Sequence, residues 1–452
     1  MDEKALRDLS KHAHVVVSWV GDDGYPVQTP AQFTVDLEEG AVRLAATGLV
    51  LPTDRRVNVI ASHIRPQPGT GYDQRRYTEL WGTLRRDGAE MVLAPDRSWG
   101  WDENEVPFFE YAERSNKRGL AYMRALGEER GVEVKPRLSP VWTALLATRL
   151  PFLTATVVPV LVGIAVAGRQ GYFDLWLAVL TLIGAAAVHI GVNVANDVFD
   201  TLSGADDANV NPTQFSGGSR VIQRGLVTLK RMGLISVGAY GVGIAIGLYL
   251  VLTRESTELL VIGVLGVLIS VFYTAPPLRL VHHGLGEIAV AIGFGPLMVL
   301  GAYVVQAEKF TTEPFVASVP IAILIALVLY VNEIPDRRSD AAVGKRTLPV
   351  RLSRDAVTAG FLVAVCAAFA TLFVAAALGV IPRPAVISLL GLPLALNVYR
   401  GIRQYYTSPY ELMATMGKNV QLHLVVGMLM FVSYLASIAI DGLLDDPPEL
   451  LT

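Results

Sequence analysis

Acidic residues gather at the end of one long apolar stretch and again, much later, at the end of another. The first group is Asp197 and Asp200, with Asp206 shortly after. The second is Asp336 and Asp340, which on a helix lie one turn apart on one face. Magnesium prefers carboxylate, water and phosphate oxygens, and usually takes one or two protein carboxylates together with substrate phosphates. We therefore predict that the two groups hold a diphosphate through magnesium. The expected metal ligands are Asp197, Asp200, Asp206, Asp336 and Asp340.

Asparagines stand beside both acidic groups. Asn193 precedes Asp197 by one helical turn, so the two share a helix face. Asn196 immediately precedes the first group, and Asn332 begins the second. We expect Asn193, Asn196 and Asn332 to contact substrate, with Asn193 also serving as a supporting ligand.

Glycine-rich and basic segments follow the acids. Ser216-Gly217-Gly218-Ser219-Arg220 and then Arg224 follow the first group, and Lys345-Arg346 follows the second. Glycine lets backbone N–H groups approach an anion, and guanidinium or ammonium groups neutralise a departing diphosphate. We expect Arg220, Arg224 and Arg346 to bind the diphosphate and Lys345 to act in catalysis. The alternative interpretation of each cation is the charge bias of membrane-protein loops.

Two other interpretations of the acidic groups are open. Carboxylates at helix ends can be solvated loop residues, although two groups, each followed by glycine and basic residues, favour a site. Ionisable groups near membrane depth are costly and usually functional, and an ion-coupled transporter would also use them. Transporters often contain inverted repeats and discontinuous helices, whereas paired acidic loops beside phosphate-suited cations favour an enzyme.

Long apolar runs must position these residues. A helix needs roughly 20 apolar residues to cross a bilayer, and the second half of the chain offers nine candidates. They lie at approximately 142–166, 173–195, 232–252, 258–275, 285–306, 314–332, 356–380, 384–400 and 419–440. The second and the sixth end in the acidic groups, which places both groups on one membrane face. The sequence predicts an all-α polytopic bundle of about nine transmembrane helices.

Positive charge is unevenly divided between the loops. Most of the Lys and Arg residues lie after the second, fourth, sixth and eighth candidate helices. The alternate loops hold only Arg169, Arg254, Lys309 and Arg383. Because cytoplasmic loops are enriched in Lys and Arg, we expect the chain in the cytoplasmic membrane, with the acidic groups and the N-terminal domain facing the cytoplasm.

The composition excludes a single ordinary globular domain. Of 452 residues, 52% are hydrophobic and 17% charged, and the mean hydropathy is +0.43. The apolar excess begins after about Lys135, so we place a soluble domain at 1–135 and a transmembrane domain at 136–452. We expect no nucleic-acid partner, and the net charge of -3 says little about others. The single cysteine, Cys366, allows no intrachain disulfide, and Met1-Asp2-Glu3-Lys4 is charged where a signal peptide needs an apolar segment.

From about Trp142 onward, roughly two-thirds of the chain resembles the UbiA superfamily of intramembrane prenyltransferases, whose members are nine-helix bundles with two Asp-rich motifs on the cytoplasmic side. Asn196-Asp197-Val-Phe-Asp200 resembles the first motif, and Asp336-Arg-Arg-Ser-Asp340 resembles the second. The usual spacing would place an acid where this chain has Thr201, which leaves the ligand set of the first motif open. The segments similar to the branch that prenylates dihydroxynaphthoate for menaquinone are Gly344-Lys-Arg-Thr-Leu-Pro-Val-Arg351, Tyr273-Thr-Ala-Pro-Pro-Leu-Arg279, and Gly284-Leu-Gly-Glu287 with Gly295-Pro296.

The resemblance implies magnesium-dependent transfer of a polyprenyl group from a polyprenyl diphosphate to an aromatic acceptor such as 1,4-dihydroxy-2-naphthoate. Metal-bound diphosphate would leave an allylic carbon, and the aromatic ring would attack the carbocation in an apolar tunnel. The acceptor could instead be 4-hydroxybenzoate, a glycerol lipid or a tetrapyrrole. Tyr273 and Arg149 are expected substrate contacts, Arg149 for a carboxylate or the diphosphate, unless it reaches the membrane interface as long cations do. The expected catalytic residues are Asp197, Asp200, Asp336, Asp340 and Lys345.

The N-terminal segment alternates apolar and polar residues in short runs. Residues 14–20 and 33–36 are typical of β-hairpins, and a helical pattern appears only at 106–130. This predicts a soluble, mostly-β, split-barrel-like domain. It resembles the flavin-binding split barrels of the pyridoxamine-phosphate-oxidase type, which implies that Arg75, Arg76 and Trp99 could bind FMN. The alternative is a non-catalytic regulatory or dimerisation domain.

Overall fold

The computed structural model describes residues 3–46, 50–53, 55–67, 71–88 and 90–445. It divides into two compact units, Met1–Ser115 and Asn116–Thr452, whereas the sequence places the change in composition between residues 135 and 136. Contacts explain the difference. The Asn116 amide donates to the carbonyl oxygen of Gln223 at 3.3 Å, and Lys117 donates to that of Asp207 at 3.2 Å. Polar residues ahead of the apolar stretch therefore already belong to the second unit.

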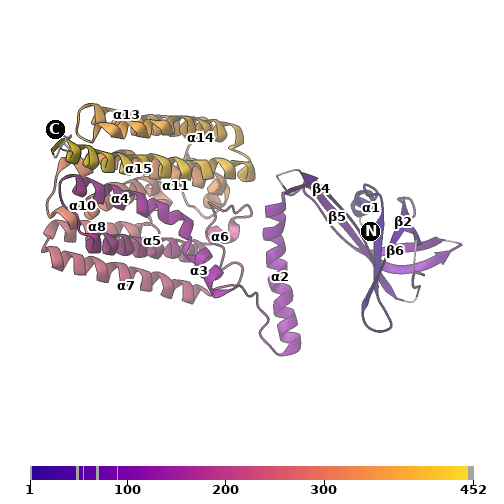
Figure 1. Cartoon of the computed structure of the whole chain (residues 1–452). Coiled ribbons are helices and arrows are strands. Elements are labelled where there is room, and N and C mark those ends of the chain that lie inside the picture. The colour runs from indigo at the N-terminus through magenta and orange to yellow at the C-terminus, as the bar shows by residue number, and fades with distance from the viewer. Residues whose placement is uncertain (1–2, 47–49, 54, 68–70, 89, 446–452) are drawn as a thin grey trace, which may run out of the picture. The chain divides into compact units, whose positions relative to one another are not determined.

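Six antiparallel strands form a closed barrel in the first unit (Figure 1). They are β1 (Val15–Val20), β2 (Pro26–Asp36), β3 (Ala41–Ala46), β4 (Arg56–Gln67), β5 (Gly71–Asp87) and β6 (Glu90–Asp102). Their order is β1-β2-β3-β6-β5-β4, and pairing of β1 with β4 closes the barrel. A short helix, α1 (Glu3–Leu9), precedes them. The mostly-β domain predicted from the sequence is confirmed.

Alternating apolar residues fill the interior of this barrel. Successive side chains of a strand point to opposite faces, and on β1 Val15 and Val17 are both fully buried. Val17 is paired in the register with Val59 of β4, which is also fully buried. Leu6 and Leu9 of α1 pack into the same cluster. The first unit therefore has a hydrophobic core of its own.

The second unit consists of helices. It begins within α2 (Phe108–Arg130), because the boundary between the units falls in that helix. The α-helices are α3 (Pro140–Thr148), α4 (Thr154–Arg169), α5 (Leu175–Ser203), α6 (Ala205–Ala208), α7 (Leu229–Arg254), α8 (Thr257–Phe272), α9 (Gly286–Ile292), α10 (Met298–Ala307), α11 (Thr312–Ala342), α12 (Leu348–Arg351), α13 (Arg354–Ala377), α14 (Leu392–Tyr405) and α15 (Pro409–Asp445). The tighter or wider turns are η1 (Leu150–Leu153), η2 (Leu280–His283), η3 (Gly293–Leu297) and η4 (Arg383–Gly391). The long helices run side by side (Figure 1).

Seven helices of the described chain are long and apolar enough to cross a membrane. They are α5, α7, the continuous α9–α10 helix, α11, α13, the η4–α14 segment and α15. Two shorter apolar helices, α4 and α8, complete the set. These segments correspond in order to the nine predicted from the sequence. The predicted polytopic helical bundle is confirmed.

The first predicted span, 142–166, is wrong in one respect, because it is not one continuous helix. α3 ends at Thr148, Arg149 takes a left-handed conformation with φ 53°, and the turn η1 leads into α4. A residue in this conformation commonly ends a helix, because the chain cannot continue its right-handed path through it. The apolar composition runs across the break, so the pattern of hydrophobic residues did not reveal it.

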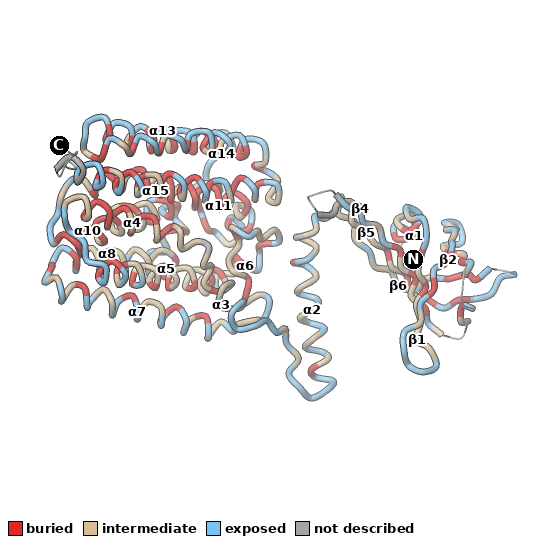
Figure 2. The backbone as a smooth tube through the Cα atoms, viewed as in Figure 1, coloured by how far each residue is buried: buried red, intermediate tan, exposed pale blue. Residues whose placement is uncertain are grey.

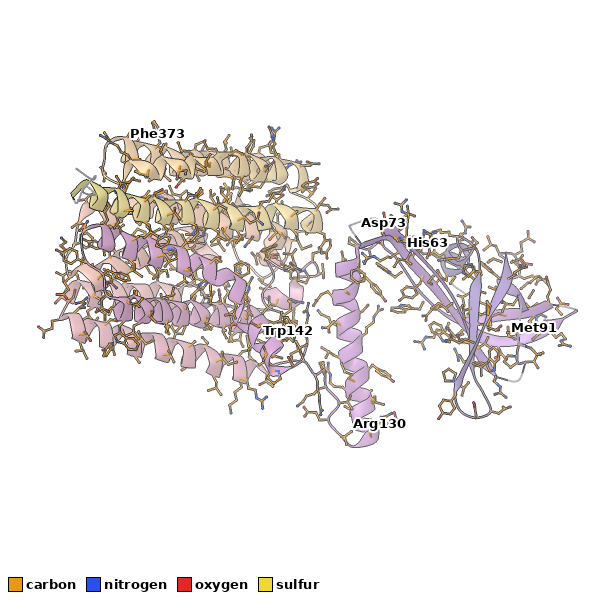
Figure 3. The ribbon with its side chains drawn as sticks, in the orientation of Figure 1. His63, Asp73, Met91, Arg130, Trp142 and Phe373 are labelled. Atoms are coloured by element: carbon orange, nitrogen blue, oxygen red, sulfur yellow. The ribbon has the colours of Figure 1, made fainter. Side chains whose placement is uncertain are left out.

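α11 lies at the centre of the bundle and α7 at its edge (Figure 2). In the most apolar stretch of each helix, 67% of the α11 residues are buried but only 17% of the α7 residues. Leu234, Val237 and Leu252 of α7 are exposed, as lipid-facing side chains of a membrane bundle are. Phe373 of α13 and Trp142 of α3 also project outward (Figure 3). The second acidic group is therefore carried by an inner helix, α11.

Candidate active site

A cavity of about 590 Å³ lies among α4, α5, α7, α8, α10 and α11. Most of its wall is apolar and includes Val188, Leu260 and Val305. Its polar lining comes mainly from the C-terminal ends of α5 and α11 and the loops that follow them. The charged lining residues are Arg149, Asp200, Asp206, Glu333, Asp336, Asp340 and Lys345. A cavity of this kind suits a ligand that has an anionic head and a hydrocarbon tail.

The last turns of α5 carry the first acidic group. Asp197 is 2% exposed, and its Oδ2 accepts a hydrogen bond from the backbone N–H of Ser219 at 3.1 Å. Asp200 accepts from the side-chain amide of Asn196 at 3.0 Å. Gly204 follows in a left-handed conformation, φ 79°, which ends the helix and lets the chain turn at once into α6. The first group is thus split between a helix and the turn that follows.

Asp206 lies in α6, outside the membrane helices, yet it is almost fully buried. The Arg220 guanidinium donates to its backbone carbonyl oxygen, and Gln223 donates to its Oδ2 at 3.2 Å. Burial, and then the carboxylates of Asp200 and Asp197, raise the pKa of Asp206 to about 8. Three carboxylates therefore lie close enough to repel one another, and a bound cation would relieve that repulsion.

Two donors from the loop after α6 hold Asp336. The side-chain amide of Asn209 donates to Oδ1 at 2.8 Å, and the backbone N–H of Gly217 donates to Oδ2 at 2.9 Å. Asp340 follows one turn later on α11, and its buried Oδ2 has no hydrogen-bond partner among the described residues. The loop of the first acidic group thus holds the second, so the two groups meet at the cavity.

Lys345 lies between the two acidic groups. Its Nζ is 3.4 Å from Asp200 Oδ2 and 3.6 Å from Asp340 Oδ1. Burial by itself lowers the pKa of Lys345, but Asp200 and Asp340 outweigh burial and raise this pKa well above its ordinary value. Lys345 is therefore a fixed cation that joins the end of α5 to the end of α11.

The turn at Gly217 and Gly218 leaves no room for side chains. Gly217 has φ 75° and Gly218 has φ 71°, a region that favours glycine. A Cβ added at Gly218 would lie 3.0 Å from Asp197 Oδ1 and 3.1 Å from Asp206 Oδ1. The N–H groups of this loop, which the sequence predicts to approach an anionic ligand, here donate to carboxylates of the site, Gly217 to that of Asp336. The glycines thus let the loop reach the acids themselves.

Not every site residue expected from the sequence lines the cavity. Arg224 and Arg346 are exposed, and neither is part of its wall. Arg220 is buried against Asp206, and Asp197 lies behind the lining. The expected residues that do line the cavity are Arg149, Asn193, Asn196, Asp200, Asp206, Tyr273, Asn332, Asp336, Asp340 and Lys345.

Arg149 owes its position to the break between α3 and α4. Its Nη2 donates to the carbonyl oxygen of Phe215 at 3.4 Å, and its guanidinium carbon lies 4.7 Å from the centre of the Phe152 ring. A guanidinium has five N–H donors, so the bond to Phe215 leaves others for an anionic group in the cavity. A straight helix through this point would have placed the side chain elsewhere.

Several residues at the site were missed or given no role in the sequence analysis. Asn209 and Gln223 hold Asp336 and Asp206, but they stand in a polar loop that gives no local signal of this function. Glu333 offered a signal that was not used, because a carboxylate inside a long apolar run is unusual. The polar loop between α6 and α7 is therefore a structural part of the site.

The carboxylates fit magnesium in one particular mode. Among the residues that the structure describes, no three acidic, histidine or cysteine side chains converge to form a complete metal site. Magnesium usually binds one or two carboxylates and takes its other ligands from water and substrate phosphates. Separated carboxylates at the mouth of a cavity suit that mode, and Asp340 Oδ2 is available for it. Asp200 and Asp206 also line the cavity, and Asp200 Oδ2 lies 3.4 Å from Lys345 Nζ.

The first unit contains a smaller cavity of about 250 Å³, lined in part by Arg76 and Trp99. The Trp99 indole N–H donates to the Tyr77 hydroxyl at 2.7 Å, and Arg75 is ion-paired with Glu103. Ligand pockets commonly measure roughly 300–1,000 Å³. Because the cavity is smaller than that and two of the three expected contacts serve the barrel itself, these residues do not fit FMN.

Comparison with known proteins identifies the family that this part of the chain matches. The profile of the UbiA prenyltransferase family matches residues 156–435, a range that contains both acidic groups. A solved structure of a UbiA homolog from Archaeoglobus fulgidus bound to DMAPP and Mg2+ covers 66% of this chain and 99% of its own, with 14% sequence identity and a TM-score of 0.48.

Curated relatives also match a large part of the chain. The 2-carboxy-1,4-naphthoquinone phytyltransferase of Synechocystis sp. is 29% identical over 306 residues, which are 66% of this chain and 94% of the relative. The 1,4-dihydroxy-2-naphthoate octaprenyltransferase of Mycobacterium leprae is 32% identical over 257 residues, 57% of this chain and 84% of the relative. The enzyme of the same name from Bacillus subtilis is 30% identical over 212 residues, 47% of this chain and 66% of the relative.

Proposed function

Because this chain belongs to the UbiA prenyltransferase family, we propose that it transfers a polyprenyl group from an allylic polyprenyl diphosphate to 1,4-dihydroxy-2-naphthoate, a step of menaquinone biosynthesis. The chain is a multi-pass membrane prenyltransferase. Relatives named for naphthoate or naphthoquinone substrates support this choice of acceptor.

The observation that carries the proposal is the meeting of two acidic groups at the charged end of an apolar cavity. Asp200 and Asp340 come from different helices and share the cation Lys345. A polyprenyl diphosphate has the same division into a charged head and an apolar chain. The cavity therefore offers complementary surroundings to both parts of this substrate.

The residues of the chain would divide the work as follows. Asp200, Asp206, Asp336 and Asp340 would hold magnesium and, through it, the diphosphate. Bound magnesium supplies positive charge that stabilises the leaving diphosphate. Lys345, already oriented by two carboxylates, adds a fixed cation next to that group. Arg149 would orient the carboxylate of the aromatic acid, and the apolar wall would keep water from the allylic carbon.

We place the site on the cytoplasmic side of the cytoplasmic membrane. The segment between α5 and α7 contains Arg220 and Arg224, the first turn of α7 adds Lys230, and the loop after α11 contains further cations, whereas the opposite loops contain few. The enrichment of Lys and Arg in cytoplasmic loops supports this orientation. For the N-terminal barrel we propose no flavin chemistry.

A direct experiment uses the full chain in lipid vesicles with labelled geranyl diphosphate and magnesium. Separate reactions contain 1,4-dihydroxy-2-naphthoate, 4-hydroxybenzoate or no acceptor. We expect a lipid-soluble, labelled aromatic product with the naphthoate, no product after chelation, and recovery when magnesium is returned. Asp340→Ala should lose the product, whereas Asp355→Ala, at an exposed position of α13, should not. Product from 4-hydroxybenzoate but not from the naphthoate would identify 4-hydroxybenzoate as the acceptor instead. No product with either would overturn the proposal.

A further inference from the structure

Two glutamates inside the second unit have no role in the function proposed above. Glu333 of α11 is 6% exposed and lines the cavity. Glu287 of α9 is 8% exposed and interacts directly with Glu333. All four carboxylate oxygens are buried, and apart from the interaction between the two side chains and the backbone of Glu287 itself, no described residue donates a hydrogen bond to them. Such buried polar atoms are rare in folded proteins and call for an explanation.

The closeness of the two carboxyl groups is favourable only if at least one of them is protonated. Two ionised carboxylates in contact have no hydrogen to share, whereas one proton between them joins them in a single hydrogen bond. The pair can therefore gain or lose a proton within the cavity wall. A protein keeps ionisable groups at membrane depth chiefly where they are used.

Glu333 differs from the other acids of the cavity wall. Asp336 accepts hydrogen bonds at both oxygens, and Asp200 accepts one from the Asn196 amide. Asp206 accepts a hydrogen bond from Gln223, and Asp340 is ion-paired with Lys345. Among the described lining acids, Glu333 is the one whose hydrogen-bond partner is another carboxyl group, that of Glu287. It is thus the lining carboxylate best able to accept a proton from a ligand.

The position of Glu333 also suits this task. It stands three residues before Asp336, so the two project from the same side of α11. Because α11 ends shortly after Asp340, Glu333 lies one turn further into the apolar part of the cavity. A diphosphate held at Asp336 would place its hydrocarbon end, and the ring that attacks it, on the side of Glu333.

We propose that Glu333 is the base that takes the hydroxyl proton of the aromatic acceptor, and that Glu287 positions it. This inference rests on the prenyl transfer proposed above. Loss of the proton makes the ring oxygen anionic and the ring carbons more nucleophilic, which is what attack on an allylic carbon requires. Glu333 would touch the substrate, and Glu287 would act through Glu333.

The electrons and protons balance. The O–H bond of the acceptor breaks, and its proton binds the Glu333 carboxylate. The oxygen electrons move into the ring, a ring carbon forms a bond to the allylic carbon, and the carbon–oxygen bond to diphosphate breaks with its electron pair on diphosphate. The ring carbon then loses its hydrogen as a proton to the departed diphosphate, or loses its carboxylate as carbon dioxide. The electrons of that bond restore the aromatic ring, and Glu333 returns its proton to the oxygen.

Charged and titratable groups around the pair belong to three elements. Lys345 follows α11, Asp340 and Tyr330 belong to α11 itself, and Tyr273 follows α8. Lys345 and Asp340 are already bound to each other. A dependence of the rate on pH must therefore be assigned by comparing variants, not from the wild-type profile alone.

The test compares Glu333→Gln, Glu333→Asp, Glu287→Gln and the control Glu258→Gln in the full chain. Glu258 is an exposed residue of α8 that does not line the cavity. The assay uses geranyl diphosphate, magnesium and 1,4-dihydroxy-2-naphthoate. We expect Glu333→Gln to lower kcat roughly 10²- to 10⁴-fold with little change in KM for geranyl diphosphate. Glu333→Asp should recover part of the rate, and Glu258→Gln should behave as wild type.

Two further measurements separate proton transfer from a structural role. The rate of Glu333→Gln should rise steadily with pH as the acceptor ionises in solution, and a naphthoate with a more acidic hydroxyl should restore activity. Glu287→Gln should move the acidic limb of the pH profile. Equal losses at every pH and with every acceptor would overturn the proposal, as would a Glu333→Gln variant within about threefold of wild type. Failure of the wild type to form product overturns both proposals, whereas an active wild type with an equally active variant overturns only this one.

Discussion

The backbone N–H of Gly217 donates to the carboxylate of Asp336 at 2.9 Å and so joins the loop after α6 to α11. Asn209, in the same loop, donates to the other oxygen at 2.8 Å. The second acidic group is thus held by the loop that follows the first. A change in either group should disturb the other.

Asp336→Asn tests this connection. Asparagine keeps the size of the side chain but turns an amide N–H₂ toward Gly217 or Asn209, both of which are donors. We expect product formation to fall roughly 10²- to 10³-fold, the scale of losing one well-placed electrostatic contact. Amide hydrogen exchange at Gly217 should become faster. The exposed control Asp355→Asn should retain activity, and unchanged exchange at Gly217 in Asp336→Asn would contradict the structure.

Gly218→Ala should damage the site by crowding it. The added Cβ would lie 3.0 Å from Asp197 and 3.1 Å from Asp206, at φ 71°. We expect the carboxylates to move and magnesium-dependent product formation to fall at least about tenfold, measured at saturating magnesium. Gly238→Ala in α7 is the matched control, since nothing lies within 4 Å of its added Cβ. Equal activities of the two variants would show that the turn tolerates a side chain.

Lys345→Gln removes the cation between two carboxylates. Breaking a buried ion pair from one side typically costs about 3–5 kcal/mol, so the variant should unfold at a lower temperature than wild type. Magnesium should raise the unfolding temperature of Lys345→Gln more than that of wild type, because the ion would replace the missing charge at Asp200 and Asp340. Lys345→Arg keeps the charge and is the control. If magnesium raised the unfolding temperature of all three proteins equally, Lys345 would not be next to the metal site.

The Arg75–Glu103 pair makes the stability of the first unit depend on pH. Hydrogen bonding by Arg75 lowers the pKa of Glu103 from its ordinary 4.5. A depressed folded-state pKa contributes stability above the unfolded-state value and loses it as pH falls through the folded-state value. Glu103→Gln should therefore destabilise the protein at neutral pH, by about 1 kcal/mol or less for this partly exposed pair, and the difference from wild type should shrink as the pH falls below the ordinary value of 4.5. Thermal unfolding of the full chain over this pH range measures this, with the exposed Glu38→Gln as control.

The proposed orientation can be tested by labelling cysteines. Cys366 is the single cysteine of the sequence, so a Cys366→Ala background gives a clean start. Lys230→Cys lies in the first turn of α7, at the end of the loop that follows the first acidic group, and Lys309→Cys lies in an opposite loop; both positions are exposed. A membrane-impermeant maleimide added to intact cells should label position 309 at once and position 230 only after permeabilisation. The reverse pattern would invert the orientation.

Spacing along the sequence correctly predicts which residues lie together when they belong to one helix. Asp336 and Asp340 share a face of α11 because they are one turn apart, and no knowledge of the fold is needed for that. The apolar runs likewise revealed the helices of the bundle. The break at Arg149 was invisible to them, because its cause is a single left-handed residue within a continuous apolar run.

Partners far apart in the chain could not be found by spacing. Asn209 and Asp336 are 127 residues apart, and Lys345 and Asp200 are 145 apart. Arg220 and Arg224 look equivalent in the sequence, yet one is buried beside Asp206 and the other is exposed. Only the folded path of the loop separates them. The N-terminal flavin prediction also depended on partners that spacing does not reveal, because Trp99 is bonded to Tyr77 of the neighbouring strand and Arg75 is paired with Glu103, just after that strand pair.

The 145 residues between Asp200 and Lys345 also set an order of events during synthesis. A ribosome delivers α5 to the membrane before α7 to α11 exist, so Asp200 is at first without its counter-charge, Lys345. Carboxylates at the end of a helix can wait in the aqueous headgroup layer, whereas carboxylates at its middle could not. The location of the first acidic group at a helix terminus thus allows α5 to insert before its partners are made. The site is complete only after α11 and Lys345, which follows it, have emerged.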